Sequence, residues 1–126
     1  MDDFKNEHAL ETFRSLVTIA VAALQSLVLL NGGALVALLA YIGQIDDRAA
    51  FAGRVAFPVA SFILGLVMAS MAFFSAYVTQ LLLYGESALG AKRSHQPAIW
   101  VTLGLAVISL GAFAVGSFCG ATALTQ

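Results

Sequence analysis

The sequence predicts an all-α integral membrane protein with three transmembrane helices packed antiparallel. Of its 126 residues, 60% are hydrophobic and only 10% are charged, and the mean hydropathy is +0.91. Average soluble domains carry about a quarter charged residues. The charged residues also fall into three short clusters, which leaves uncharged stretches at 15–45 and 55–85 and no permanent charge over 94–126. Each stretch exceeds the roughly 20 helical residues that cross a hydrocarbon core of about 30 Å.

The three spans are expected at about 13–43, 54–84 and 97–122, within a single domain of residues 1–126. Pro58 and Pro97 then lie near helix starts, where a missing N–H does no harm. The connecting loops are short, so neighbouring spans should run antiparallel. Residues 2–14 are expected to form a short amphipathic helical lead-in that rests on the headgroups.

The ends of the spans indicate how the chain is oriented in the membrane. Its first eleven residues hold four acidic residues against one lysine, unlike the basic start of a signal peptide, so the first helix is expected to be retained. Lysines and arginines number four on one side of the membrane (Lys5, Arg14, Lys92, Arg93) and two on the other (Arg48, Arg54). This asymmetry favours an orientation with the N-terminus cytoplasmic and the C-terminus outside. The membrane is expected to be a bacterial-type inner membrane. Phe13, Tyr84 and Trp100 are expected at the inner interface.

Small residues predict where the helices touch, because close approach of backbones drives helix association in lipid. The third span has Gly116 and Gly120 four residues apart, with Ser109 on the same side. One face of the second span is small (Ser61, Gly65, Ala72, Ser75, Ala76, Thr79), and its other face is bulky and should meet lipid (Ile63, Leu66, Val67, Phe74, Tyr77, Leu81). The first span has a small or polar stripe, expected to be its contact face (Thr18, Ala22, Gln25, Gly33, Ala37, Ala40, Gln44).

Asn31 lies one position from the middle of the first uncharged stretch, where an unpaired amide is costly. Gln25 lies six residues earlier, about 120° away on a regular helix, so one stripe cannot bury both. Either another subunit covers a second surface, or the helix is irregular at Gly32 and Gly33, a pair typical of kinks. We expect Asn31 to form a hydrogen bond to a neighbouring helix. The alternative is that Asn31 lines a pore or an ion site beside a broken helix. Ser70 is expected to bond its own i−4 carbonyl.

Few residues suggest a role in catalysis, proton transfer or metal binding. No charged residue lies in the interior of a span, since Arg14 and Arg54 are at span ends, and this counts against proton relays, ion-coupled transporters and voltage sensors. The two histidines, His8 and His95, lie outside the spans, and with Glu11 they make too few ligands for a metal site, so no metal or haem is predicted. Cys119 is interpreted as a buried thiol, with a disulfide between subunits as the alternative. The sequence has no Ser/His/Asp set and no facing pair of carboxylates, so we do not expect an enzyme. A net charge of −1 does not favour binding to nucleic acid.

These observations favour a non-enzymatic protein without cofactors that works by helix–helix assembly in the bilayer. Its partners would be copies of itself or other membrane subunits. The alternative is an oligomeric pore in which Gln25, Asn31 or Ser109 lines a central path. Three spans in a chain of this length resemble the architecture of phage holins, small proteins that permeabilise the inner membrane. This resemblance covers no specific motif, and the charged C-terminal tail often seen in holins is not present.

Overall fold

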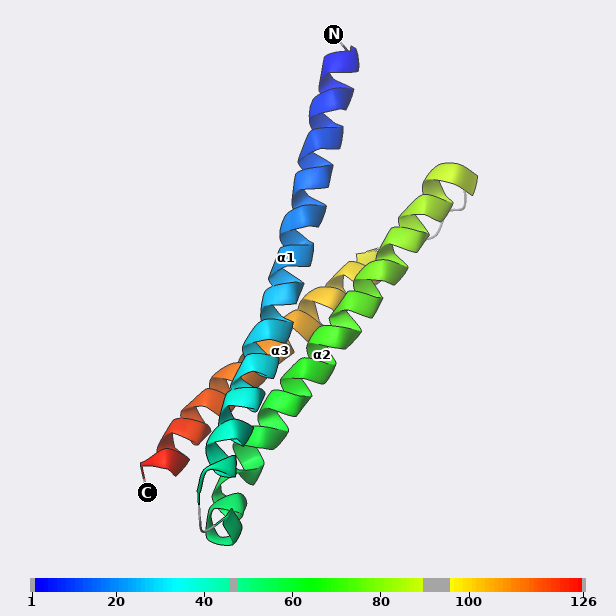
Figure 1. The fold of residues 1–126 in the computed structure, drawn as a ribbon. Helices are drawn as coiled ribbons and strands as arrows, with labels where there is room; N and C mark the ends of the chain where they lie inside the picture. Colours follow the sequence, from blue (N-terminus) through cyan, green and yellow to red (C-terminus); the bar gives the residue numbers. More distant parts are fainter. Residues whose placement is uncertain (1, 46–47, 90–95, 126) are drawn as a thin grey trace.

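The computed structural model describes residues 2–45, 48–89 and 96–125, which form three long helices (Figure 1). These are α1 (Asp2–Gly43), α2 (Arg48–Leu89) and α3 (Gln96–Leu124), each antiparallel to the one before it. The segments Leu10–Gly43, Phe51–Gly85 and Gln96–Leu124 are long and apolar enough to cross a membrane. The predicted fold class is therefore confirmed, and the chain is an all-α, three-helix membrane protein.

The helices extend further than the expected spans, because the helical backbone continues into the polar clusters at their ends. The lead-in over residues 2–14 is continuous with the rest of α1. α2 starts at Arg48, so Pro58 lies inside the helix and not near its start, and its ring is fully buried. Pro97 is the second residue of α3, where proline is readily accommodated. α1 also runs unbroken through Gly32 and Gly33, so the structure does not show the irregular helix considered for this pair.

The buried residues of the three helices recur mainly in steps of three, four or seven. On α2 the buried positions with this spacing are Val55, Pro58, Phe62, Gly65, Ala69, Ala72 and Thr79. On α1, Leu24, Asn31 and Leu38 follow one another at intervals of seven, and on α3 Ser109 and Gly116 do the same. A seven-residue repeat of this kind is typical of helices that coil around one another with a left-handed twist.

The three helices do not pack equally along their lengths. α2 and α3 lie side by side over most of the bundle, whereas the N-terminal half of α1 runs apart from α2 (Figure 1). Accordingly, Leu24 is the first buried residue of α1 among those described. The core therefore lies in the half of the bundle that contains the C-terminal part of α1, where Leu38, Val55 and Phe62 form its apolar cluster.

Candidate functional site

One polar layer joins the three helices near the middle of the first span. Asn31 of α1 and Ser109 of α3 are both fully buried, with 0% of their surface exposed. Asn31 Nδ2 donates to Ser109 Oγ at 3.2 Å, and Ser109 Oγ donates to the carbonyl oxygen of Gly65 on α2 at 2.8 Å. Asn31 Nδ2 also donates to the carbonyl of Leu27, one turn earlier on its own helix, at 3.0 Å. The layer thus takes one residue from each helix.

The donors of this layer are all used, which explains how polar groups are tolerated at this depth. The hydroxyl proton of Ser109 goes to a carbonyl, so its oxygen is left to accept from Asn31, and the second amide proton of Asn31 goes to Leu27. Hydrogen bonds between membrane helices contribute about 0.6 kcal/mol on average and up to about 1.7 kcal/mol. The layer therefore adds modest stability. Because leaving these buried polar groups without partners is costly, the layer also favours one alignment of the three helices along their axes.

Gly65 provides the space that the Asn31 side chain fills. A Cβ on residue 65 would overlap Asn31 Oδ1 and lie 2.5 Å from Asn31 Cγ and 2.9 Å from Nδ2. Asn31 Oδ1 has no hydrogen-bond partner and lies against the Gly65 backbone, where only the weaker Cα–H···O type of contact is available. A residue larger than glycine at position 65 is therefore incompatible with Asn31 in this position.

The other predicted glycines lie in different surroundings. A Cβ on Gly116 of α3 would lie 2.9 Å from the ring of Phe62, whereas one on Gly120 would lie 3.8 Å from Pro58, an ordinary contact. Gly32 would make a similar ordinary contact with Leu66 at 3.8 Å. Gly33 has nothing within 4 Å and is exposed. Among the glycines that the structure describes, Gly65 and Gly116 are thus the two at which an added Cβ would come within 3.0 Å of a neighbouring side chain.

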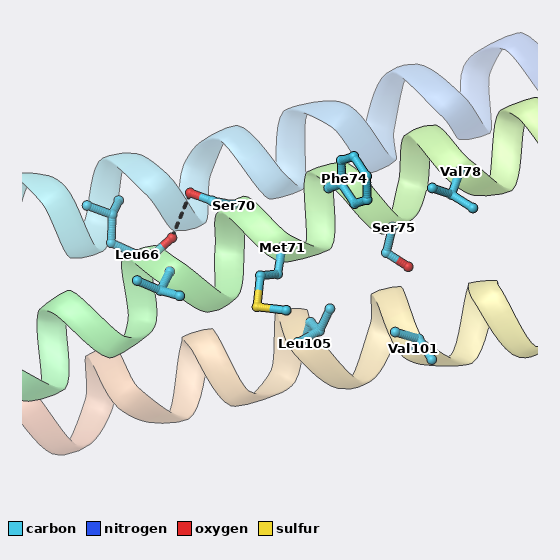
Figure 2. Close-up of a pocket in the computed structure, with 9 residues that line it drawn as sticks. Leu66, Ser70, Met71, Phe74, Ser75, Val78, Val101 and Leu105 are labelled. Atoms are coloured by element: carbon cyan, nitrogen blue, oxygen red, sulfur yellow. Dashed lines mark hydrogen bonds between the residues drawn. The ribbon is translucent and has the colours of Figure 1, made fainter.

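A second polar contact lies between α2 and α3, toward the start of α3. Thr102 Oγ1 lies 2.9 Å from Ser75 Oγ, and Ser75 Oγ lies 3.3 Å from the carbonyl oxygen of Ala98. Figure 2 shows the Ser75 hydroxyl on the side of α2 that faces α3. Beside it lies an otherwise apolar groove of about 660 Å³. In this groove Ser70 Oγ donates to Leu66 O at 2.9 Å, as predicted (Figure 2). This groove offers no uncommitted polar side chain.

The small or polar stripe predicted as the contact face of the first span faces away from α2 and α3. All seven of its residues are exposed in the structure: Thr18, Ala22, Gln25, Gly33, Ala37, Ala40 and Gln44. Nine residues separate Asn31 from Ala22 on one side and from Ala40 on the other, which is two and a half turns and hence the opposite face. The prediction was wrong for contacts within the chain, because burying the Asn31 amide turns this stripe away from α2 and α3.

A clue to the true contact face of α1 was present in the sequence. Asn31 has the strongest reason of any residue in the first span to be buried, so its own face should pack. Leu24 and Leu38 lie seven residues before and after it and are buried with it. Choosing the face by its small residues missed these two leucines, because the contact face of α1 contains Asn31 and large apolar side chains on either side of it.

The remaining candidate residues form no cluster in the described part of the chain. Within it, no group of three or more His, Cys, Asp or Glu residues could hold a metal ion. His8 and Glu11 are exposed on α1, and Cys119 is a half-buried free thiol. His95, Lys92 and Arg93 lie outside the described residues. No protein-family model, curated protein or solved structure matches the chain.

Proposed function

We propose that this chain is a non-enzymatic membrane protein that acts by helix–helix assembly, as a homo-oligomer or as an accessory subunit of a membrane complex. The assembly surface is the outward stripe of α1, defined by Thr18, Ala22, Gln25, Gly33, Ala37, Ala40 and Gln44. We also propose that the chain lies in a bacterial-type inner membrane, and the Lys and Arg asymmetry supports an orientation with its N-terminus in the cytoplasm.

The observation that supports this proposal is the exposure of Gln25. It lies five residues, or about 7.5 Å, from the middle of the first uncharged stretch, well inside a hydrocarbon core of about 30 Å. Its side chain is exposed and makes no hydrogen bond to another described residue. A carboxamide facing acyl chains is costly, and a partner helix that offers a donor and an acceptor removes this cost. The small residues around Gln25 allow that helix to approach closely.

The same geometry makes the pore alternative less favoured. Asn31 and Ser109 are committed to each other inside one chain, so of the three residues considered for a central path only Gln25 faces outward. A pore would need Gln25 from several copies to face water. Assembly without a pore predicts that proteoliposomes retain an entrapped dye and that expression leaves the membrane potential intact, and leakage in either assay would favour the pore.

Cysteine crosslinking in native membranes tests the assembly surface directly. In a Cys119→Ser background, Ala22→Cys is expected to crosslink to another chain, and Ala114→Cys on an exposed part of α3 is the matched control. The mass of the particle extracted into nanodiscs distinguishes self-assembly from a subunit of a larger complex. Gln25→Leu is expected to weaken assembly about threefold to tenfold, which corresponds to one interhelical hydrogen bond. A monomer without any partner, and equal crosslinking at both cysteines, would contradict the proposal.

A further inference from the structure

A groove of about 320 Å³ opens where the N-terminal half of α1 diverges from the other two helices. Its walls come from all three helices, between Ala20 and Leu27 on α1, Ala76 and Gln80 on α2, and Ile99 and Ala106 on α3. Several of these side chains, including Ala20, Gln80 and Ile99, are exposed, so the groove opens sideways from the bundle. It is separate from the polar layer at Asn31 and from the outward stripe of α1.

The depth of the groove in the membrane follows from the middle of each uncharged stretch. Ala20 and Gln80 each lie ten residues from the middle of their stretch, which places them about 15 Å from the bilayer centre, at the edge of the hydrocarbon. Leu27, at the other end, lies only about 4.5 Å from the centre by the same reasoning. Exposed Tyr84 and Trp100, at 69% and 71%, fit the adjoining interface where aromatic residues gather. The groove thus begins at the interface and extends inward.

The polarity of the groove changes along this depth. Its polar residues, Thr79, Gln80 and Thr102, lie in the outer half, and the inner end is lined by apolar side chains such as Leu27 and Ala106. The two threonine hydroxyls are bonded to groups of their own chain: Thr79 Oγ1 lies 2.9 Å from Ser75 O, and Thr102 Oγ1 lies 2.9 Å from Ser75 Oγ. The Gln80 carboxamide is exposed and makes no hydrogen bond to another described residue. One uncommitted polar group therefore lies at the outer end of an apolar groove.

We infer that this groove holds one phospholipid of the bilayer, with an acyl chain between the three helices and an ester carbonyl accepting a hydrogen bond from Gln80 Nε2. The apolar inner end offers no partners to water, so water does not fill it. A protein helix is a poorer match, because the groove extends only about 10 Å along the helices, or about two helical turns. The ester region of a phospholipid lies at the depth of Gln80, and its tail continues toward the bilayer centre.

Lipid retention in native mass spectrometry tests this inference, using the full chain reconstituted in nanodiscs of phosphatidylethanolamine and phosphatidylglycerol and released into mild detergent. The wild type is expected to keep one phospholipid per chain. Ala23→Phe fills the groove and is expected to lower this retention at least about tenfold. Ala22→Phe, the neighbouring alanine on the outward stripe, is the matched control and should retain the lipid. Conversely, Ala22→Phe should weaken assembly and Ala23→Phe should not, so the two proposals can fail separately.

A second arm tests the polar end of the groove. The wild type is expected to prefer ester-linked over ether-linked phospholipid, because an ether lacks the carbonyl acceptor, and Gln80→Leu should lose this preference. If Ala23→Phe does not fold, judged by its helical circular dichroism, Ala20→Phe one turn nearer the interface makes the same test. A wild type that retains no phospholipid, or variants that retain as much as the wild type, would overturn the inference. A change of oligomeric mass in Ala23→Phe without loss of lipid would instead identify a protein helix as the occupant.

Discussion

Replacing Gly65 with alanine is the sharpest test of the polar layer. The added methyl would occupy the space of the Asn31 carboxamide, so α1 must move away from α2 or Asn31 must leave its bonds. Overpacking a close contact costs about 1–3 kcal/mol, and losing the Asn31–Ser109 bond adds about 0.6 kcal/mol. The higher helix propensity of alanine stabilises α2 by up to about 1 kcal/mol and offsets part of this cost. We therefore expect Gly65→Ala to lower the free energy of unfolding by about 1.5 kcal/mol.

Gly104→Ala is the matched control for this prediction. Gly104 is an exposed helical glycine with nothing within 4 Å of an added Cβ, so its replacement should stabilise the helix by up to about 1 kcal/mol. Both variants can be compared by reversible unfolding in mixed micelles, followed by far-ultraviolet circular dichroism. If Gly65→Ala proves as stable as Gly104→Ala, the close contact described here does not exist.

A double-mutant cycle then assigns the cost to its cause. Asn31→Ala removes the atoms that the methyl at position 65 would overlap, so Gly65→Ala should cost less in that background. The coupling energy between the two positions is expected to be at least about 1 kcal/mol, within the range measured for residues in contact. Additive effects would mean that the cost of Gly65→Ala arises from some neighbour other than Asn31.

Three further predictions follow from the same structure and use the same unfolding assay. Gly116→Ala should destabilise the bundle by about 1 kcal/mol because a buried ring must shift, whereas Gly120→Ala should be neutral or stabilising. Equal effects would contradict the different surroundings of the two glycines. Ser109→Ala should lower the free energy of unfolding by about 0.6–1.7 kcal/mol because it loses hydrogen bonds between helices. Ser70→Ala loses only a bond within its own exposed turn, so its free energy of unfolding should stay within about 0.5 kcal/mol of wild type. Gly32→Ala should stabilise by up to about 1 kcal/mol because α1 is continuous there, and a clear loss of stability would indicate that the helix needs a flexible point.

Much of α2 and α3 could be predicted from the sequence. The small face of α2 lies inside, as expected, with Gly65 and Ala72 buried, and bulky residues such as Val67 and Phe74 on its other side are exposed. Gly116 of α3 likewise lies in the contact with α2. The contact face of α2 was visible because its small and bulky side chains lie on different sides of the helix, and close approach requires the small side. On α3 the four-residue spacing of Gly116 and Gly120 indicated the contact face, although other glycines such as Gly104 are exposed.

The partner of Asn31 could not be predicted in the same way. The sequence placed an amide near the bilayer centre, but Ser109 lies 78 positions further along the chain, and only the packing of the helices brings the two together. The specific need for glycine at position 65 has the same origin. It depends on where the Asn31 side chain lies on a neighbouring helix, and no local pattern on α2 contains this information.

The sequence by itself determined the number of spans and their helical form. The length and composition of an uncharged segment decide whether it can cross hydrocarbon, and a segment in hydrocarbon must satisfy its own backbone, whatever its neighbours are. Only the tertiary structure decided which face of α1 turns inward. Lipid tails are as apolar as leucine, so apolarity does not orient a helix in the membrane; the fit of Asn31 against Gly65 and Ser109 does, and it leaves the stripe around Gln25 facing outward.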